Sequence, residues 1–495
     1  MKKKLTACLL IFVLVLTSIA PISVDAATLT WPILEFGDTG ANVTALQYLL
    51  NYYGYGLTVN GTFNSSTDDA VREFQSQEYL TVDGIVETDM WIVLTAVPAQ
   101  RMSSYNSDLT KAIQYLLNNK FGFELPAVNG IFDLNTKMAV MMVQAKLNLP
   151  QNGMVDANTW NNLISASAQD VYAYYTEGEY VRLDLELSYY QNITPANLKV
   201  WIDRLDSAYL SYEELVGATP QNGTKINIVD SSGTYGWAWV YPNTSTIYWQ
   251  EDYIASTFGQ INNTGDWSFG ILHEMGHLFD LQNKWNFNAE FFAVFKSYYV
   301  IEQLSAAVIP DSYTSVLYVG DELKAFFETD ADSSYDNAFA NGVFSWGGAE
   351  HLFIMIKDAI GWEPFAQTFR YFSDLPSPPA TNLGKFNLFM TKLRDFSHAN
   401  VLGKISPEDL ALFEEELGGT IAYTNRLFLG DADGDGDVTA ADASAILRHV
   451  VSIAPITDPE LLVNADVNLD GAVNSADSSA ILRYLVNLDT LPPGQ

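Results

Sequence analysis

Residues 271–279, Ile271-Leu272-His273-Glu274-Met275-Gly276-His277-Leu278-Phe279, decide how the central part of this chain is built. Two histidines four positions apart share one face of an α-helix, so both imidazoles can point at one metal ion. The apolar residues supply the buried face of that helix, and the polar run 262–266 is expected to be its start. Since the chain has only five histidines in 495 residues, chance gives this spacing with a probability on the order of 10⁻².

The residue types favour a zinc hydrolase site. Catalytic zinc takes three protein ligands and keeps one position open for water, whose pKa it lowers to about 7. We predict His273 and His277 as two ligands, and Glu274 as the general base that passes a proton from water to the leaving amine. Glu290 is the preferred third ligand, and His351 is the alternative. The apolar residues after Glu290 recur at helical spacing and would anchor it: Phe291, Phe292, Phe295 and Tyr299.

The motif with its downstream glutamate resembles the gluzincin class of zinc metallopeptidases. Residues 273–302, with their aromatic-rich helix, look most like the enhancin or mucinase type, and Gly361-Trp362-Glu363-Pro364-Phe365 resembles the later helices of those enzymes. The resemblance spans about 180–415. It implies an α+β, zincin-like peptidase domain over 180–418, with one catalytic Zn²⁺ held by His273, His277 and Glu290 and with Glu274 as the base.

Two segments before the motif read as β-strands, 225–229 and 245–249. An edge strand beside the zinc helix would hold an extended peptide by main-chain pairing. Plain sheet core is an equally open interpretation of both segments.

The N-terminal third contains a duplication. Leu46-Gln47 recurs as Ile113-Gln114 and Phe74-Gln75 as Val143-Gln144, while the offset from Gly61 to Gly130 equals that from Trp91 to Trp160. Each unit reads as short helices with glycine turns. The units, about 35–97 and 105–166, resemble the three-helix peptidoglycan-binding domain of wall hydrolases, which implies peptidoglycan or a related wall glycan as partner. The alternative is that both bundles only space or dock the catalytic domain.

A second repeat lies near the C-terminus and has the pattern of two calcium loops. Oxygen side chains at loop positions one, three, five and twelve, glycine at six and a main-chain carbonyl at seven suit a hard cation. The first loop would bind Ca²⁺ through Asp431, Asp433, Asp435, Asp437 and Asp442. The second would use Asp466, Asn468, Asp470, Ala472 and Asp477. Aspartates clustered in this way repel one another without the ion, so the module is expected to fold poorly when calcium is removed.

Aspartate at position twelve makes residues 429–487 resemble a type I dockerin. The resemblance implies two Ca²⁺ ions and a cohesin module of a scaffold protein as partner, in a cellulosome-like setting of polysaccharide catabolism. It places the partner-choosing residues at loop positions ten and eleven, and the likeness of the two copies implies binding in two orientations. Those positions are Ala440, Ala441, Ser475 and Ala476. A structural calcium module without a cohesin partner is the alternative.

Composition and the N-terminus point to export. Residues 1–26 have three lysines, an apolar run and a small-residue cleavage site, as a secretory signal does. Cleavage would remove Cys8, the only cysteine. The formal net charge of −34 argues against a nucleic-acid partner, and no later apolar run is long enough to cross a membrane. We therefore expect a secreted protein, extracellular and associated with the cell surface or a scaffold.

Taken together, these patterns predict a multidomain, mainly α-helical protein with an α+β catalytic domain. Its predicted function is that of a secreted zinc endopeptidase acting on protein, glycoprotein or cell-wall peptide, tethered to wall glycan and docked on a cohesin scaffold. The alternative is a non-catalytic attachment protein with a degenerate peptidase domain.

Overall fold

The structure is a computed structural model that describes residues 30–96, 107–125, 127–220, 223–233, 235–241, 243–310, 316–421, 429–486, 488–489 and 491. The predicted signal sequence over 1–26, with Cys8, lies outside the described residues. The chain divides after Gln169 into two compact units, and each is treated by itself below.

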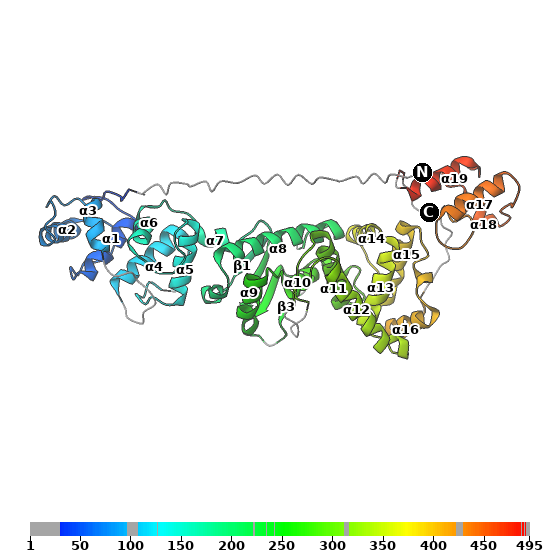
Figure 1. The fold of residues 1–495 in the computed structure, drawn as a ribbon, viewed down its shortest axis with the longest axis horizontal. Coiled ribbons are helices and arrows are strands. Elements are labelled where there is room, and N and C mark those ends of the chain that lie inside the picture. The colour runs from blue at the N-terminus through cyan, green and yellow to red at the C-terminus, as the bar shows by residue number, and fades with distance from the viewer. Residues whose placement is uncertain are drawn as a thin grey trace, which may run out of the picture. The chain divides into compact units, whose positions relative to one another are not determined.

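The first unit consists of two bundles of three helices each (Figure 1). The first bundle contains α1 (Ala41–Tyr52), α2 (Ser65–Gln77) and α3 (Thr88–Thr95). The second contains α4 (Asp108–Phe121), α5 (Leu134–Lys146) and α6 (Ala157–Ser165). The first helices of the two bundles, α1 and α4, pack against each other, and Trp91 and Trp160 are fully buried at equivalent positions. The duplication read from the sequence is thus a duplication of structure.

Four buried glutamines explain which residues recur in the duplication. In the first bundle, the Gln47 side chain accepts from the Gly61 main-chain N–H at 2.9 Å and donates to the Thr62 carbonyl at 3.0 Å. Gln75 holds the next glycine loop in the same way. Gln114 and Gln144 repeat both arrangements in the second bundle. Each glutamine satisfies the polar main-chain atoms of one Asx-Gly loop, which would otherwise be buried without partners.

The second unit contains a small mixed sheet. Its strands are β1 (Val181–Asp184), β2 (Ile226–Ser231), β3 (Ala238–Val240) and β4 (Thr246–Gln250), in the order β1-β2-β4-β3. The first three in that order run parallel, while β3 pairs antiparallel with β4 at the edge. The predicted strands 225–229 and 245–249 correspond to β2 and β4, which are both interior. The two edge strands are β1 and β3. The one beside α10 (Phe269–Leu278) is β3, whose three residues are too few to show a period in the sequence.

Helices cover and extend this sheet (Figure 1). Around it lie α7 (Val171–Thr176), the 3₁₀ helix η1 (Leu187–Asn192), α8 (Pro195–Val216), α9 (Glu251–Thr264), α10 (Phe269–Leu278), η3 (Leu281–Asn283) and α11 (Ala289–Leu304). After them come α12 (Asp321–Asn337), η4 (Phe339–Asn341), α13 (Trp346–Ile360), α14 (Glu363–Asp374), α15 (Asn382–Ser397), η5 (Leu402–Lys404) and α16 (Pro407–Leu417). The unit ends with α17 (Ala440–Val450), α18 (Pro459–Ala465) and α19 (Ser475–Leu485).

The core around α11 is largely aromatic. The side chains that follow Glu290 on α11 are buried, as the helical spacing of the sequence predicts. They pack against aromatic rings of α13, α14 and α15. Full burial of one such side chain stabilises a fold by roughly 1.5–3 kcal/mol. The N-terminal end of α11 is therefore held rigidly where Glu290 projects from it.

One predicted boundary was wrong. The polar run 262–266 does not begin the helix of the histidine motif; its first residues end α9. Gly265 terminates α9 in the left-handed conformation, with φ of 76°, which costs glycine little. The Asp266 carboxylate then accepts from the Ile309 main-chain N–H at 2.9 Å. Consequently α10 starts only at Phe269, one turn before His273.

The chain is thus multidomain and mainly helical with one small mixed sheet, as predicted from the sequence. Among the residues that the structure describes, no helix is both long enough and apolar enough to cross a membrane.

Candidate metal centres

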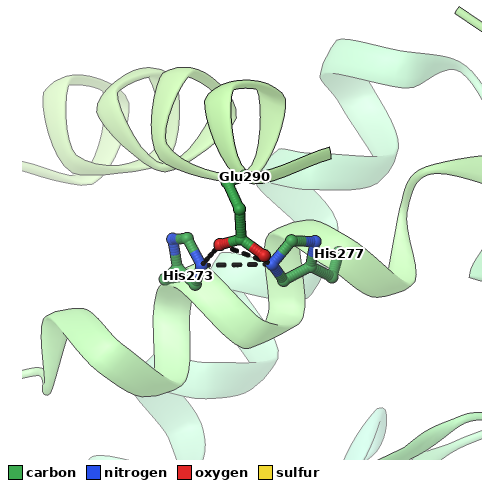
Figure 2. A group of neighbouring side chains, drawn as sticks. All are labelled: His273, His277 and Glu290. Atoms are coloured by element: carbon green, nitrogen blue, oxygen red, sulfur yellow. Dashed lines mark hydrogen bonds and ion pairs between the residues drawn. The ribbon is translucent and has the colours of Figure 1, made fainter. Parts of the chain in front are cut away.

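The histidine motif lies on α10, and Glu290 lies in the first turn of α11. The Asn288 side chain caps α11 by accepting from the Phe291 main-chain N–H at 2.9 Å, which fixes where the helix begins. The two helices pack closely at Gly276, where an added Cβ would stand 2.9 Å from the Ala293 carbonyl oxygen. Figure 2 shows the Glu290 carboxylate reaching from α11 toward both imidazoles on α10.

The three side chains form a nearly equilateral triangle of donor atoms. Nε2 of His273 and Nε2 of His277 are 3.1 Å apart. Oε2 of Glu290 lies 3.2 Å from the first and 3.5 Å from the second. The sequence predicted these three residues as zinc ligands, and the structure brings all three together.

This triangle fits a zinc ion in both dimension and chemistry. Two ligand atoms that each lie about 2.0–2.1 Å from one tetrahedral ion are roughly 3.3 Å apart, which is close to the three separations seen here. Imidazole nitrogen and carboxylate oxygen are zinc ligands. The residues present therefore suit Zn²⁺ with three protein ligands and one side left open.

Glu274 lies beside the triangle on α10 and is 9% exposed. Burial raises the pKa of its carboxyl above the usual range, while His273 and His277 oppose the rise. A carboxyl whose pKa is shifted toward neutrality suits proton transfer near pH 7.

Carboxylates set the charge of His277. Burial lowers the pKa of His277, but the carboxylates of Asp280 and Glu290 outweigh it and raise this pKa to about 9. Hydrogen bonds from His273 and His277 hold the pKa of Glu290 well below its usual range. Without a metal, His277 therefore carries an extra proton, which supplies positive charge next to Glu290. A cation bound there would displace this proton.

The alternative ligand His351 lies elsewhere. Its Nδ1 is 2.6 Å from the Asp332 carboxylate, and its ring packs against Tyr335. It does not belong to the group that includes His273, His277 and Glu290.

A cleft of about 1,090 Å³ opens beside Glu274, His277 and Glu290. All three residues of the edge strand β3 line it, together with the exposed ring of Tyr235 and with Tyr241. The main-chain groups on the side of β3 away from β4 are not used by the sheet. Sequence reasoning missed this strand and also missed Asp280, although Asp280 stands three residues after His277 and so near it on the helical surface.

The first predicted calcium loop gathers its aspartates without the ion. Ligand oxygens of Asp431, Asp433 and Asp435 lie within 4.8 Å of one another. Burial, followed by the charges of neighbouring aspartates, raises the pKa of Asp431 to about 6. The position-twelve Asp442 is buried, and its carboxylate accepts from the Ala432 main-chain N–H at 2.8 Å.

The second loop follows the same plan. The Asp466 carboxylate accepts from the Gly471 main-chain N–H at 2.8 Å, and the buried Asp477 accepts from Asn468 N–H at 3.1 Å. Asn468 and Asp470 are exposed on the loop, as is Ala472, whose predicted role is that of a main-chain ligand. The predicted partner-facing residues are all exposed in the first turns of α17 and α19: Ala440, Ala441, Ser475 and Ala476.

The two loops differ in what they contact. The Asp437 carboxylate of the first loop accepts from the Asn400 main-chain N–H at 2.9 Å and lies 3.5 Å from Lys404 Nζ. The Val438 N–H donates to the His398 carbonyl at 3.1 Å. In the second loop, Ala472 occupies the position equivalent to Asp437, and no carboxylate is present there to make such a contact.

Two family models match parts of the chain. The model described as "Putative peptidoglycan binding domain" matches residues 39–94 and 106–163. The model described as "Dockerin type I domain" matches residues 429–486. These residues are a type I dockerin. The dockerin implies calcium binding and a cohesin partner, the N-terminal repeats imply binding to wall glycan, and both are consistent with a place outside the cell or at its wall.

More distant similarities cover less. The chain is 32% identical over 80 residues to "Carboxy-terminal processing protease CtpA" of Bacillus subtilis (strain 168), which covers 16% of this chain and 17% of that protein. It therefore spans about a sixth of the length of this relative. Two crystal structures of a functionally unknown conserved protein from Bacillus anthracis str. Ames, one of them a mutant, match at 14% identity. They cover 49% of this chain and 51% of theirs, with TM-scores of 0.36 and 0.37, which is too little likeness to assign a fold.

Proposed function

We propose that residues 180–418 form a zinc-dependent peptidase, attached to wall glycan by the N-terminal repeats and to a cohesin-bearing scaffold by the dockerin. The observation that carries the proposal is the triangle of His273, His277 and Glu290 with Glu274 beside it. A group of two imidazoles and two carboxylates at the edge of a cleft has no evident packing role. It has the composition that a zinc hydrolase needs.

When bound, zinc supplies Lewis acidity for the substrate carbonyl and for water. The residues of the chain do the rest. His273, His277 and Glu290 hold the ion, while Glu274 accepts the proton of the attacking water and then delivers it to the leaving nitrogen. The raised pKa of Glu274 favours this return of the proton.

The edge strand supports a peptide as substrate. An extended segment that pairs with the free side of β3 would lie along the cleft beside Glu274. Such pairing recognises main-chain atoms, whichever side chains follow. We therefore infer an endopeptidase that binds extended segments of protein.

The lining of the cleft supports a protein or glycoprotein substrate over the peptide of peptidoglycan. The rings of Tyr235, Trp239 and Tyr241 offer faces for apolar side chains or sugars. A wall-peptide substrate is suggested only by the glycan-binding repeats.

A non-catalytic attachment protein is the second candidate. What favours it is that both matching family models lie outside residues 180–418. Against it stands Glu274, because a domain kept only for attachment has no physical need of a buried carboxyl beside a metal pocket.

The deciding experiment compares wild type with Glu274→Ala on casein, mucin and peptidoglycan, with the zinc content of both proteins measured. We expect Glu274→Ala to retain zinc and to lose activity by a factor of about 10² or more, as removal of a general base does. Glu363→Ala, at an exposed glutamate outside the cleft, is the matched control and should keep full activity. Zinc-loaded wild type that hydrolyses none of the three substrates would leave only the attachment function.

A further inference from the structure

A lysine buried without any exposed surface lies beneath the metal pocket. Lys296 of α11 has a side-chain exposure of 0%, and its ammonium donates to the Gly276 carbonyl, inside the histidine motif, at 2.7 Å. The same ammonium forms an ion pair with Asp280 and stands 5.4 Å from the ring centre of Trp285. Burying an ammonium costs several kcal/mol unless it is paired and hydrogen-bonded.

The partner of this lysine faces a zinc ligand. Oδ1 of Asp280 meets Lys296, while Oδ2 lies 3.6 Å from Nδ1 of His277. The Nε2 of the same imidazole points into the triangle with His273 and Glu290 (Figure 2). The Asp280 carboxylate therefore links the buried ammonium of Lys296 to Nδ1 of His277, the ring nitrogen that points away from the other candidate ligands.

This geometry selects the tautomer that the neutral His277 ring takes when it binds a metal. A carboxylate opposite Nδ1 favours the hydrogen on that nitrogen and so leaves the Nε2 lone pair free for a metal. Asp280 alone would be a poorly compensated charge with freedom to turn. Lys296 compensates the charge and holds one carboxylate oxygen, so that the other stays toward His277.

We propose that Lys296 and Asp280 are positioning residues that hold His277 in the orientation and tautomer needed to bind zinc. The inference rests on the proposed function only in taking His277 as a zinc ligand. Loss of a residue of this kind typically lowers metal affinity by 10–100-fold. We expect that loss for this pair.

The chain contains a matched control. Lys357 is also buried, pairs with Glu302 at 3.0 Å and stands 5.8 Å from the ring centre of Trp362. It therefore reproduces the lysine, carboxylate and tryptophan of the first site, but none of the three lines the cleft of the candidate zinc ligands. Lys357→Met measures the cost of removing a buried lysine from its two partly exposed partners, Glu302 and Asp358 at 2.6 Å, away from the cleft.

The test uses the full chain. Zinc affinity is measured by competition with a chromophoric chelator for wild type, Asp280→Asn, Lys296→Met and Lys357→Met. The visible absorption of the Co²⁺-loaded proteins reports ligand geometry independently of activity. We expect a 10–100-fold loss of zinc affinity and a changed Co²⁺ spectrum for the first two variants, and neither change for Lys357→Met.

Lys296→Met leaves a buried carboxylate unpaired and can fail to fold. Lys296→Met with Asp280→Asn removes both charges, keeps the shape, and should fold with the same loss of affinity. Folded variants with wild-type affinity and spectrum would overturn the inference. Wild type that binds no zinc overturns both this inference and the proposed function. Wild type that binds zinc, with the expected loss of affinity in the Lys296 and Asp280 variants, but cleaves nothing overturns the proposed function alone.

Discussion

The candidate zinc pocket and the first calcium loop gather similar numbers of ligands by opposite means. The pocket takes His273 and His277 from one helix and Glu290 from another, and a packed aromatic core fixes both helices. The calcium loop takes Asp431, Asp433 and Asp435 from five consecutive residues, two of them exposed. In the pocket, packing of the helices brings the ligands together without an ion. In the loop, the bound ion is expected to offset the repulsion between the aspartates and so to stabilise the fold.

Removal of all metal should produce the largest difference in stability between the two regions. With EDTA we expect α17 and α19 to unfold, because clustered aspartates repel one another without the ion, while α10 and α11 keep their packing. Every tryptophan precedes residue 429, so tryptophan fluorescence reports only on the rest of the chain. The expected result is a loss of helical circular dichroism with almost unchanged fluorescence.

Calcium added back alone, with zinc withheld, is the control for that experiment and should restore the circular dichroism. Hydrogen exchange assigns the change to segments. Loss of protection in 269–304 to the same extent as in 440–485 would mean that both regions depend on their ions, and the contrast would fail.

Without metal, the stabilities of the two regions should depend on pH over different ranges. The pKa of His277 is raised to about 9, so its contribution is present below about pH 6.5 and is lost as pH rises through 9. The pKa of Asp431 is raised to about 6. Its neutral form therefore favours the folded loop below about pH 4, and that gain is lost as pH rises through 6.

The His277 shift corresponds to roughly 3 kcal/mol in the free energy of unfolding. The Asp431 shift is screened by water and is worth less, roughly 1 kcal/mol. Urea unfolding of the metal-free chain from pH 6 to 10, followed by fluorescence, would measure the first shift. Recovery of helical circular dichroism as the metal-free chain is taken from pH 7 to pH 4 would report the second. His277→Asn should flatten the alkaline window without affecting the acidic one. If both regions changed stability over the same pH range, the assignment of the two ranges to His277 and Asp431 would be contradicted.

The smallest expected effect compares the two calcium loops with each other. Gly436 and Gly471 both have positive φ, 91° and 85°, and alanine at either costs about 1–2 kcal/mol of strain. A Cβ at Gly436 would also stand 2.9 Å from the Asn400 side chain, whereas at Gly471 nothing lies within 4 Å. We expect Gly436→Ala to destabilise the calcium-loaded chain by up to about 1 kcal/mol more than Gly471→Ala. Equal thermal shifts would show that the contact with Asn400 adds nothing.

The sequence was informative where ligands are close along the chain. The two histidines lie on consecutive turns, and the calcium ligands lie within twelve residues, so local periodicity is sufficient to group them. Glu290 was predicted as the third ligand because the apolar spacing after it indicates a helix that must be buried. The structure brings it to the histidines.

What could not be predicted depends on contacts between distant segments. The edge strand β3 is too short to show alternation. Lys296 stands within an apolar helix and gives no local sign that Asp280, sixteen residues earlier, is its partner. The contact of Asp437 with Asn400 joins the dockerin to residues before it and has no signature in either segment. The start of α10 was misplaced because polar residues both end and begin helices.

The four buried glutamines of the N-terminal bundles have a consequence for variation. Each holds its loop through main-chain atoms and the Asx side chain of the loop, and all but Gln75 also bond a later threonine. The remaining loop side chains are free to change while the loop keeps its shape. The two bundles can therefore drift apart in surface chemistry without losing their architecture, and a duplicated module of this kind can present two different faces to a heterogeneous polymer.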